Sequence, residues 1–330
     1  MSKPETFRPG ASPNAASKSH RERYVFAVGA AVLVTLLWST SYILNKFAFR
    51  NDIGPFTLAG LRYAVSASTL LLVRVIPLRL SASRPARRAD VPADRGRSGI
   101  RPAYIFLLGL TGYLMAQGLQ YAGQMLITPT QTSMVLAVGN TAALVALDIL
   151  WLREIRGRSS YLGIAAAVAG IIIFYYPWNF GGSSLKGLLL VLISCSGYAV
   201  HLALSRYLLK TGKAEPGDLV FLPMVIGAAG MLTLGIALEG VPNFSWPLAG
   251  ILLWLGTVNG SIAFSLWTWS QKRLRAYESS LINNLMLPEV TALDVLVFHR
   301  SLSPVELSGL LLAASAVVFV QIYPRFNRHS

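Results

Sequence analysis

Charged residues are scarce in this chain. Asp, Glu, Lys and Arg make up 13% of its 330 residues, whereas soluble domains carry about a quarter. Hydrophobic residues make up 54%, and the mean hydropathy is +0.53. Acidic residues are the scarcer of the two signs: 14 Asp and Glu stand against 29 Lys and Arg, for a formal net charge of +15. This composition excludes disordered and collagen-like chains, argues against a soluble enzyme, and points to a membrane protein.

Cysteine, histidine and catalytic motifs are also nearly missing. The chain has one cysteine, Cys195, and four histidines. It contains no CxxC pair, no HExxH motif and no glycine-rich phosphate loop ahead of a helix. A disulfide framework and a zinc cluster are therefore excluded. We expect no catalytic residues, no bound metal and no cofactor, and we do not expect an enzyme.

Long apolar runs are what the chain has instead. A bilayer core about 30 Å thick needs about 20 apolar residues in a helix. Several runs begin with proline in the first helical turn, where its missing N–H costs nothing, and Ser303 and Glu306 form a capping box. The sequence predicts an all-α integral membrane protein with ten spans, at residues 24–47, 55–77, 102–122, 127–150, 160–178, 185–206, 217–239, 247–270, 277–298 and 304–323.

The basic residues predict the topology. If the spans alternate and both termini share one side, all but five of the 29 Lys and Arg residues fall on that side. The five others are Lys46, Arg50, Arg62, Lys186 and Arg300. Because positive residues mark cytoplasmic loops, we expect a multi-pass protein of a cytoplasmic membrane with both termini in the cytoplasm. Topology and contacts with anionic membrane lipids explain the charge better than nucleic-acid binding.

The two halves of the chain resemble each other. An offset of 147 places residues 104–177 on 251–324 without a gap, so that Gln124 falls on Gln271 and Ser133 on Ser280. An offset of 156 relates the first span to the sixth, with Tyr42 on Tyr198. Each repeat holds five spans, and an odd number makes the two repeats cross the membrane in opposite senses. Inverted repeats are the architecture of alternating-access carriers.

Short motifs add a family resemblance. The first span reads Trp38-Ser39-Thr40-Ser41-Tyr42-Ile43, the second carries Leu61-Arg62-Tyr63, the fourth ends Leu152-Arg153-Glu154, and the ninth carries Leu287-Pro288-Glu289-Val290. In this order and layout, over residues 24–323, they are similar to the EamA-type ten-helix branch of the drug/metabolite transporter superfamily. The resemblance implies transport of small organic molecules, often export of amino acids or related metabolites, across the bacterial inner membrane.

The predicted organisation has two repeats and two tails. Residues 1–23 are expected to be a disordered cytoplasmic tail and 324–330 a second cytoplasmic tail. Residues 24–178 form the first EamA-like repeat, which includes a basic cytoplasmic loop at 79–101. Residues 185–323 form the second repeat.

Ionisable residues inside spans are the first functional candidates, because charge in hydrocarbon is costly. Glu289 lies about 18 Å into its span at 1.5 Å per residue, beside Pro288, which cannot donate an N–H and should break the helix. Glu289 could bind a substrate ammonium or carry a coupling proton, or it could be a protonated acid held in packing. Arg62 and Asp294 lie at similar depths, so we predict an ion pair between them or a polar network that they share, with a role in gating or proton coupling. The alternative is that Asp294 meets water and Arg62 extends to the interface.

Uncharged polar and aromatic residues complete the predicted cavity. The resemblance implies that helices 1, 3, 4, 6, 8 and 9 surround it, and aromatic walls with a few amides suit a small amphipathic solute. For His201, the competing interpretation is satisfaction by packing. The predicted substrate-binding residues are Trp38, Tyr42, Gln117, Asn140, Tyr198, His201, Asn259, Trp267, Asn283 and Glu289.

These patterns favour a secondary transporter for small solutes that works by alternating access, with protons as a candidate coupling ion. Two other classes stay open: a membrane enzyme acting on a lipid-linked substrate, and a receptor or scaffold that transports nothing. The patterns do not specify the solute, the direction of transport or the oligomeric state.

Overall fold

The computed structural model describes residues 13–81, 100–150, 158–178, 181–214, 219–243, 245–274 and 276–326, and these ranges contain helices and no strand. The first half of the chain forms α1 (Pro13–Phe49), α2 (Pro55–Ser81), α3 (Pro102–Gly109), η1 (Leu110–Gly118), α4 (Leu119–Leu126), α5 (Pro129–Leu150) and α6 (Arg158–Phe174). The second half forms α7 (Gly182–Lys210), α8 (Phe221–Glu239), α9 (Trp246–Leu253), η2 (Trp254–Ile262), α10 (Ala263–Gln271), α11 (Ala276–Asn284), α12 (Met286–Phe298) and α13 (Pro304–Phe326).

Each predicted span corresponds to one helix or to one continuous run of helices. Span three consists of α3, η1 and α4, span eight of α9, η2 and α10, and span nine of α11 and α12. Within the described residues, seven stretches are long and apolar enough to cross a membrane, and 161–174 and 304–320 are shorter apolar helices. Helix α5 lies where the remaining span is predicted. The all-helical, ten-span prediction is confirmed.

The first helix begins earlier than predicted. Helix α1 starts at Pro13, so residues 13–23 continue the helix where the sequence predicts a disordered tail. Alanines at 15 and 16 favour this extension, because alanine has the highest helix propensity. Residues 1–12, most of the predicted loop (82–99) and residues 327–330 lie outside the described residues.

The helix starts follow the local sequence. Pro55, Pro102 and Pro304 are the first residues of α2, α3 and α13. The predicted capping box is present at the start of α13: the Ser303 N–H donates to Glu306 Oε2 at 2.8 Å, and the Glu306 N–H donates to Ser303 Oγ at 3.1 Å. Both bonds satisfy donors that a helix start leaves unpaired.

Helices in corresponding positions of the two halves pack against each other. Helix α2 packs on α8, and α6 packs on α13. Small residues make the second contact close: a Cβ on Gly170 would lie 2.6 Å from the backbone N of Ala313, and a Cβ on Gly309 would lie 2.5 Å from the backbone N of Phe174. Membrane helices associate through such small-residue contacts because lipid offers no hydrophobic drive.

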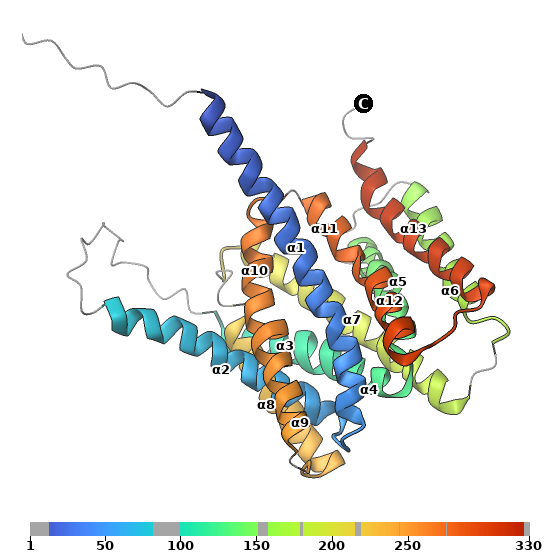
Figure 1. The fold of residues 1–330 in the computed structure, drawn as a ribbon, viewed down its shortest axis with the longest axis horizontal. Helices are drawn as coiled ribbons and strands as arrows, with labels where there is room; N and C mark the ends of the chain where they lie inside the picture. The colour runs from blue at the N-terminus through green and yellow to red at the C-terminus, as the bar shows by residue number, and fades with distance from the viewer. Residues whose placement is uncertain are drawn as a thin grey trace, which may run out of the picture.

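The chain ends identify the two faces of the bundle. The described ends of α1 and α13 both point to the top of Figure 1, and the turn between α8 and α9 lies at the bottom. We use "far end" for the face opposite these termini, where α1 and α8 end and α2 and α5 begin.

The third span of each half contains a π-helix. The 147-residue offset places η1 on residues 257–265, which overlap η2 at Trp254–Ile262. π-helical turns are rare and often occur at functional sites. The same rare feature at corresponding positions supports the internal duplication.

Candidate functional site

The ninth span is interrupted beside its acidic residue. Helix α11 ends at Asn284 and α12 begins at Met286. At the junction the Leu285 N–H donates to the Ile282 carbonyl at 3.0 Å, a tighter turn than an α-helix makes. Pro288 explains the break, because it lacks the N–H that would donate to the Asn284 carbonyl and its ring would clash with that carbonyl. The helix interruption expected at Pro288 therefore lies just before that residue.

Glu289 lies in the first turn of α12 and faces α1. Its Oε1 accepts a hydrogen bond from Thr35 Oγ1 at 3.0 Å, and its Oε2 accepts one from Ser39 Oγ at 2.8 Å. Thr35 and Ser39 are one turn apart on α1 and are fully buried. A helix start favours negative charge. The Glu289 carboxyl group is thus held between the start of α12 and the side chains of α1.

Aromatic residues and an amide join α1 to the eighth span. The Trp38 ring lies 5.3 Å from Trp267 and 5.4 Å from Phe264, measured between centroids. Trp38 Nε1 donates to the Asn259 carbonyl at 3.0 Å, and Asn259 Nδ2 donates to the Leu37 carbonyl at 2.8 Å. Asn259 belongs to η2 and is fully buried. Trp38, Asn259 and Trp267, three of the predicted cavity residues, therefore lie together.

Arg62 lies in a different cluster, surrounded by tyrosines. Its guanidinium Nη1 donates to the Tyr121 hydroxyl. The guanidinium carbon lies 5.5 Å from the centre of the Tyr63 ring and 5.9 Å from that of Tyr121. Tyr42 is buried on the neighbouring α1.

The predicted ion pair between Arg62 and Asp294 is not formed, because each residue has other partners. Asp294 Oδ2 accepts hydrogen bonds from the Thr130 N–H at 3.1 Å and from Thr130 Oγ1 at 2.5 Å. It also lies 3.6 Å from Arg300 Nη1. Equal depth in the membrane was the basis of the prediction, and depth alone does not determine which sides of two helices face each other.

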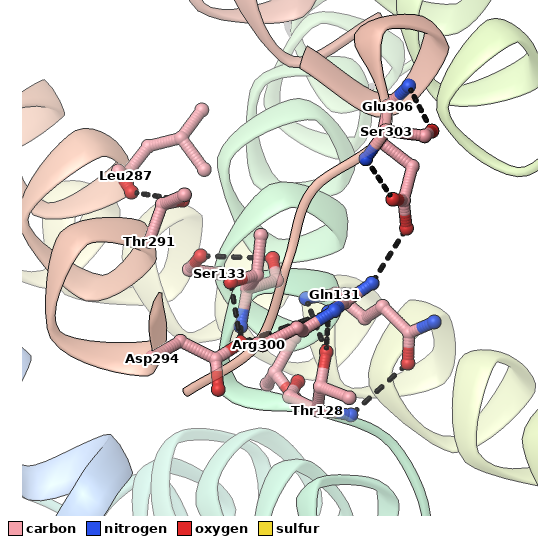
Figure 2. A network of polar contacts seen from close by, with 11 residues as sticks. Thr128, Gln131, Ser133, Leu287, Thr291, Asp294, Arg300, Ser303 and Glu306 are labelled. Carbon is pink, nitrogen blue, oxygen red and sulfur yellow. Dashed lines mark hydrogen bonds and ion pairs between the residues drawn. The ribbon is translucent and has the colours of Figure 1, made fainter. Parts of the chain in front are cut away.

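Asp294 and Arg300 belong to a polar network at the far end (Figure 2). Thr130 lies in the first turn of α5, so Asp294 caps that helix from another repeat. Arg300 Nη1 donates to Thr128 Oγ1 at 2.7 Å, and Arg300 Nη2 lies 2.6 Å from Glu306 Oε1. Arg300 thus connects the start of α5 to the start of α13.

Glu239 caps the start of α2 as Asp294 caps the start of α5, and it is not among the residues predicted from the sequence. Glu239, the last residue of α8, accepts hydrogen bonds from the N–H groups of Phe56 and Thr57, both at 2.9 Å, and from Thr57 Oγ1 at 2.7 Å. An acidic residue at the end of one span and a proline-led start at the same face were the available signals. We call the Glu239 and Asp294 caps, with the bonds of Arg300, the far-end contacts.

The remaining predicted residues are spread over several helices. His201 Nδ1 lies 3.3 Å from the Leu108 carbonyl, so its packing partner is the third span. Asn140 lies on α5, and its Oδ1 is buried without a hydrogen-bond partner. Gln117 lies in η1 and Tyr198 on α7, both partly buried, and Asn283 is exposed on α11.

A buried amide that the prediction omitted, Gln124, joins α4 to α1. Asn45 Nδ2 donates to Gln124 Oε1 at 2.9 Å, and Gln124 Nε2 donates to the Tyr42 carbonyl at 3.2 Å. Gln124 is fully buried. Its match to Gln271 in the repeat was the signal that could have marked it.

A groove of about 400 Å³ opens on the other side of the helix break. It lies between α5, the α11–α12 junction and α13, and Asn284, Pro288 and Ser315 are among the residues that line it. The break therefore separates the Glu289 contact with α1 from an open groove.

Comparison with known proteins identifies the family. The profile of the EamA-like transporter family matches residues 25–176 and again residues 185–322. The chain belongs to the EamA-like transporter family. The double match agrees with the duplication seen in the sequence and the π-helices. EamA-like proteins are membrane transporters, so the chain is a multi-pass membrane protein of a transporter family.

The structural comparison supports the fold of this EamA-like chain. A solved structure titled only "Crystal structure of protein" is similar, with a TM-score of 0.58 and 16% sequence identity, over 93% of this chain and 99% of that one. At this identity the likeness shows the fold alone. No curated protein matches the sequence.

Proposed function

We propose that this chain is a secondary transporter that exports amino acids or related small metabolites across the bacterial inner membrane by alternating access. The family supports a small-solute transporter. The basic residues support an orientation with both termini in the cytoplasm, which places the far end outside. The inverted repeat supports alternating access, because the two halves can exchange conformations.

The observation that carries the proposal is the position of Glu289. Transporter binding sites lie near the membrane midplane beside interrupted helices, whose freed backbone groups serve the solute and the coupling ion. Glu289 combines mid-membrane depth, an interrupted helix and two hydroxyl partners from the opposite repeat. With the Trp38–Asn259–Trp267 wall nearby on α1 and the eighth span, it forms a site for the ammonium end of an amphipathic solute.

The hydroxyl of Thr35 supports a proton-carrying role for Glu289. Thr35 Oγ1 lies 2.8 Å from the Val32 carbonyl and 3.0 Å from Glu289 Oε1. A hydroxyl has one hydrogen to donate. If that hydrogen goes to Val32, a protonated Glu289 can donate to Thr35 in return. Both protonation states of the acid can then be satisfied at this position, as a proton-coupled carrier requires.

The far-end contacts form the outer gate in this proposal. Asp294 belongs to this gate, the role predicted for it from the sequence. The other charged residues of the gate are Arg300 and Glu239, and Arg62 is not part of it. Each cap joins a helix end of the second repeat to a helix start of the first. Opening the outer side requires both caps to separate.

Transport by the Glu289→Gln variant tests the proposal. Purified protein in proteoliposomes is given radiolabelled amino acids and related metabolites, with and without a pH gradient. The wild type is expected to move at least one solute faster with the gradient, and Glu289→Gln to lose that acceleration. Glu278→Gln, on α11 beside the exposed Tyr24 hydroxyl, is the matched control and should keep it. Movement of no solute would favour a membrane enzyme or receptor, and an unchanged pH response would remove Glu289 from the mechanism.

A further inference from the structure

The guanidinium of Arg62 has no compensating anion among the described residues. The side chain is 7% exposed. Within the described residues its one side-chain hydrogen-bond partner is the hydroxyl of Tyr121, and its Nε is buried without any partner. The ion pairs of the described acids do not include Arg62.

A buried unpaired charge is costly. The effective penalty for burying an ion is several kcal/mol, even after relaxation. The faces of Tyr63 and Tyr121 offset part of it, because an aromatic face attracts a cation. They leave the Nε donor and the positive charge without a counterpart.

Packing does not account for this guanidinium. Close contacts between α2 and η2 explain why the backbone here is crowded: a Cβ on Gly256 would lie 3.1 Å from the Arg62 carbonyl, and Ser66 Oγ donates to the Gly256 carbonyl at 2.9 Å. These contacts involve the backbone of Arg62 and a residue one turn away. An apolar side chain at position 62 would satisfy them equally.

A second buried polar atom without a hydrogen-bond partner, Asn45 Oδ1, is connected to Arg62 through two residues of α4. Gln124 follows Tyr121 by one turn on α4 and is bonded to Asn45, whose Oδ1 is buried without a partner. This series of residues begins at Arg62, whose Nε is an unused donor, and ends at Asn45, whose Oδ1 is an unused acceptor.

We propose that Arg62 binds the carboxylate of the transported solute, so that the solutes of this carrier are organic acids or zwitterions and not neutral molecules or simple amines. This inference rests on the proposed transport function. A guanidinium suits the task because its planar fork binds a carboxylate with two parallel hydrogen bonds. Arg62 is then the residue that determines specificity, at a site separate from the Glu289 carboxylate.

Matched pairs of ligands test this assignment. Purified protein is screened by thermal shift against the twenty L-amino acids, their carboxamides and simple monocarboxylates. At least one carboxylate is expected to stabilise the wild type, and its carboxamide to bind at least about 30-fold more weakly, the factor expected when a buried charge pair loses one partner. Arg62→Gln should abolish the preference, and Arg62→Lys should retain part of it. Arg273→Gln, which removes an exposed arginine on the Trp269 ring, is the control and should leave the preference unchanged.

The outcomes separate this inference from the transport proposal. Equal binding of carboxylates and carboxamides by the wild type, no binding of either class, or a preference that survives in Arg62→Gln would overturn the role of Arg62. The first two comparisons need no variant, so the test holds even if Arg62→Gln does not fold. A carboxylate preference without transport in proteoliposomes would support Arg62 and refute the carrier. Transport of neutral or purely cationic solutes alone would leave the carrier standing and refute Arg62.

Discussion

The ionisable residues within the spans each have a different kind of partner. Glu289 has hydroxyl partners, Asp294 has a helix start and a cation, and Arg62 has tyrosines. Sequence position and depth identified all three as unusual. Their partners come from other helices, so only the packing of those helices could reveal them.

Asp294 should contribute measurably to stability. Asp294→Asn removes the charge that faces Arg300 and the start of α5, and we expect a loss of about 1.5–3 kcal/mol, the range for hydrogen bonds to charged groups. Thermal unfolding in detergent measures it. Asp52→Asn is the control, because Asp52 is exposed in the turn after α1, and it should unfold within about 0.5 kcal/mol of the wild type. Equal stability of both variants would show that the network adds nothing.

At the scale of elements, the helix break in the ninth span depends on one residue. Pro288→Ala restores the N–H that can bond to the Asn284 carbonyl, so α11 and α12 should join into a continuous helix. We expect a gain in stability of about 1 kcal/mol or more, since proline costs about 3 kcal/mol in a helix interior, together with slower transport.

Hydrogen exchange across residues 281–290 measures the joining. Pro304→Ala is the matched control, because Pro304 is the first residue of α13, where no helical bond is missing. Faster exchange at the break in Pro288→Ala would contradict the assignment.

The close contact between α6 and α13 should tolerate no added side chain. Gly170→Ala places a Cβ 2.6 Å from the backbone of Ala313, and overpacking of this kind costs about 1–3 kcal/mol. Gly230→Ala, on α8 with no atom within 4 Å of the added Cβ, should be neutral or stabilising. The melting temperatures of the two purified variants, compared with that of the wild type, measure the difference in stability. A stable Gly170→Ala protein would mean that these helices can separate at little cost.

On the scale of the whole molecule, the far-end contacts join the two repeats. Cysteines introduced by Thr130→Cys and Asp294→Cys, joined by a short bis-methanethiosulfonate linker, should hold the far end closed and stop transport. A reducing agent should restore it. Thr130 and Asp294 are as buried as the native Cys195, so the linker is added during turnover, when the far end opens in the proposed cycle, and all variants are made in a Cys195→Ser background. Each single-cysteine variant, treated with the same linker, is the control. Full transport by the linked double variant would show that these residues do not separate during the cycle.

Local features were predicted from the sequence because their causes are local. Apolar runs, prolines at helix starts and the capping box of Ser303 and Glu306 depend on neighbours in the chain. The repeats followed from matched positions such as Gln124 and Gln271. The failed Arg62–Asp294 pair shows the limit of this reasoning, because two residues more than 200 positions apart can share a depth and still face different helices.

The sequence alone determined that the chain crosses a membrane with ten helical spans in two repeats, because bilayer thickness and backbone hydrogen bonding leave few ways to arrange such apolar runs. Tertiary structure alone decided where the polar groups go: that Glu239 caps α2, that Asp294 caps α5, and that Arg62 is enclosed by tyrosines. The physical reason is the distance along the chain between the interacting residues. Hydrophobic patterning is read along one helix, whereas a hydrogen bond forms only between side chains that packing brings within about 3 Å.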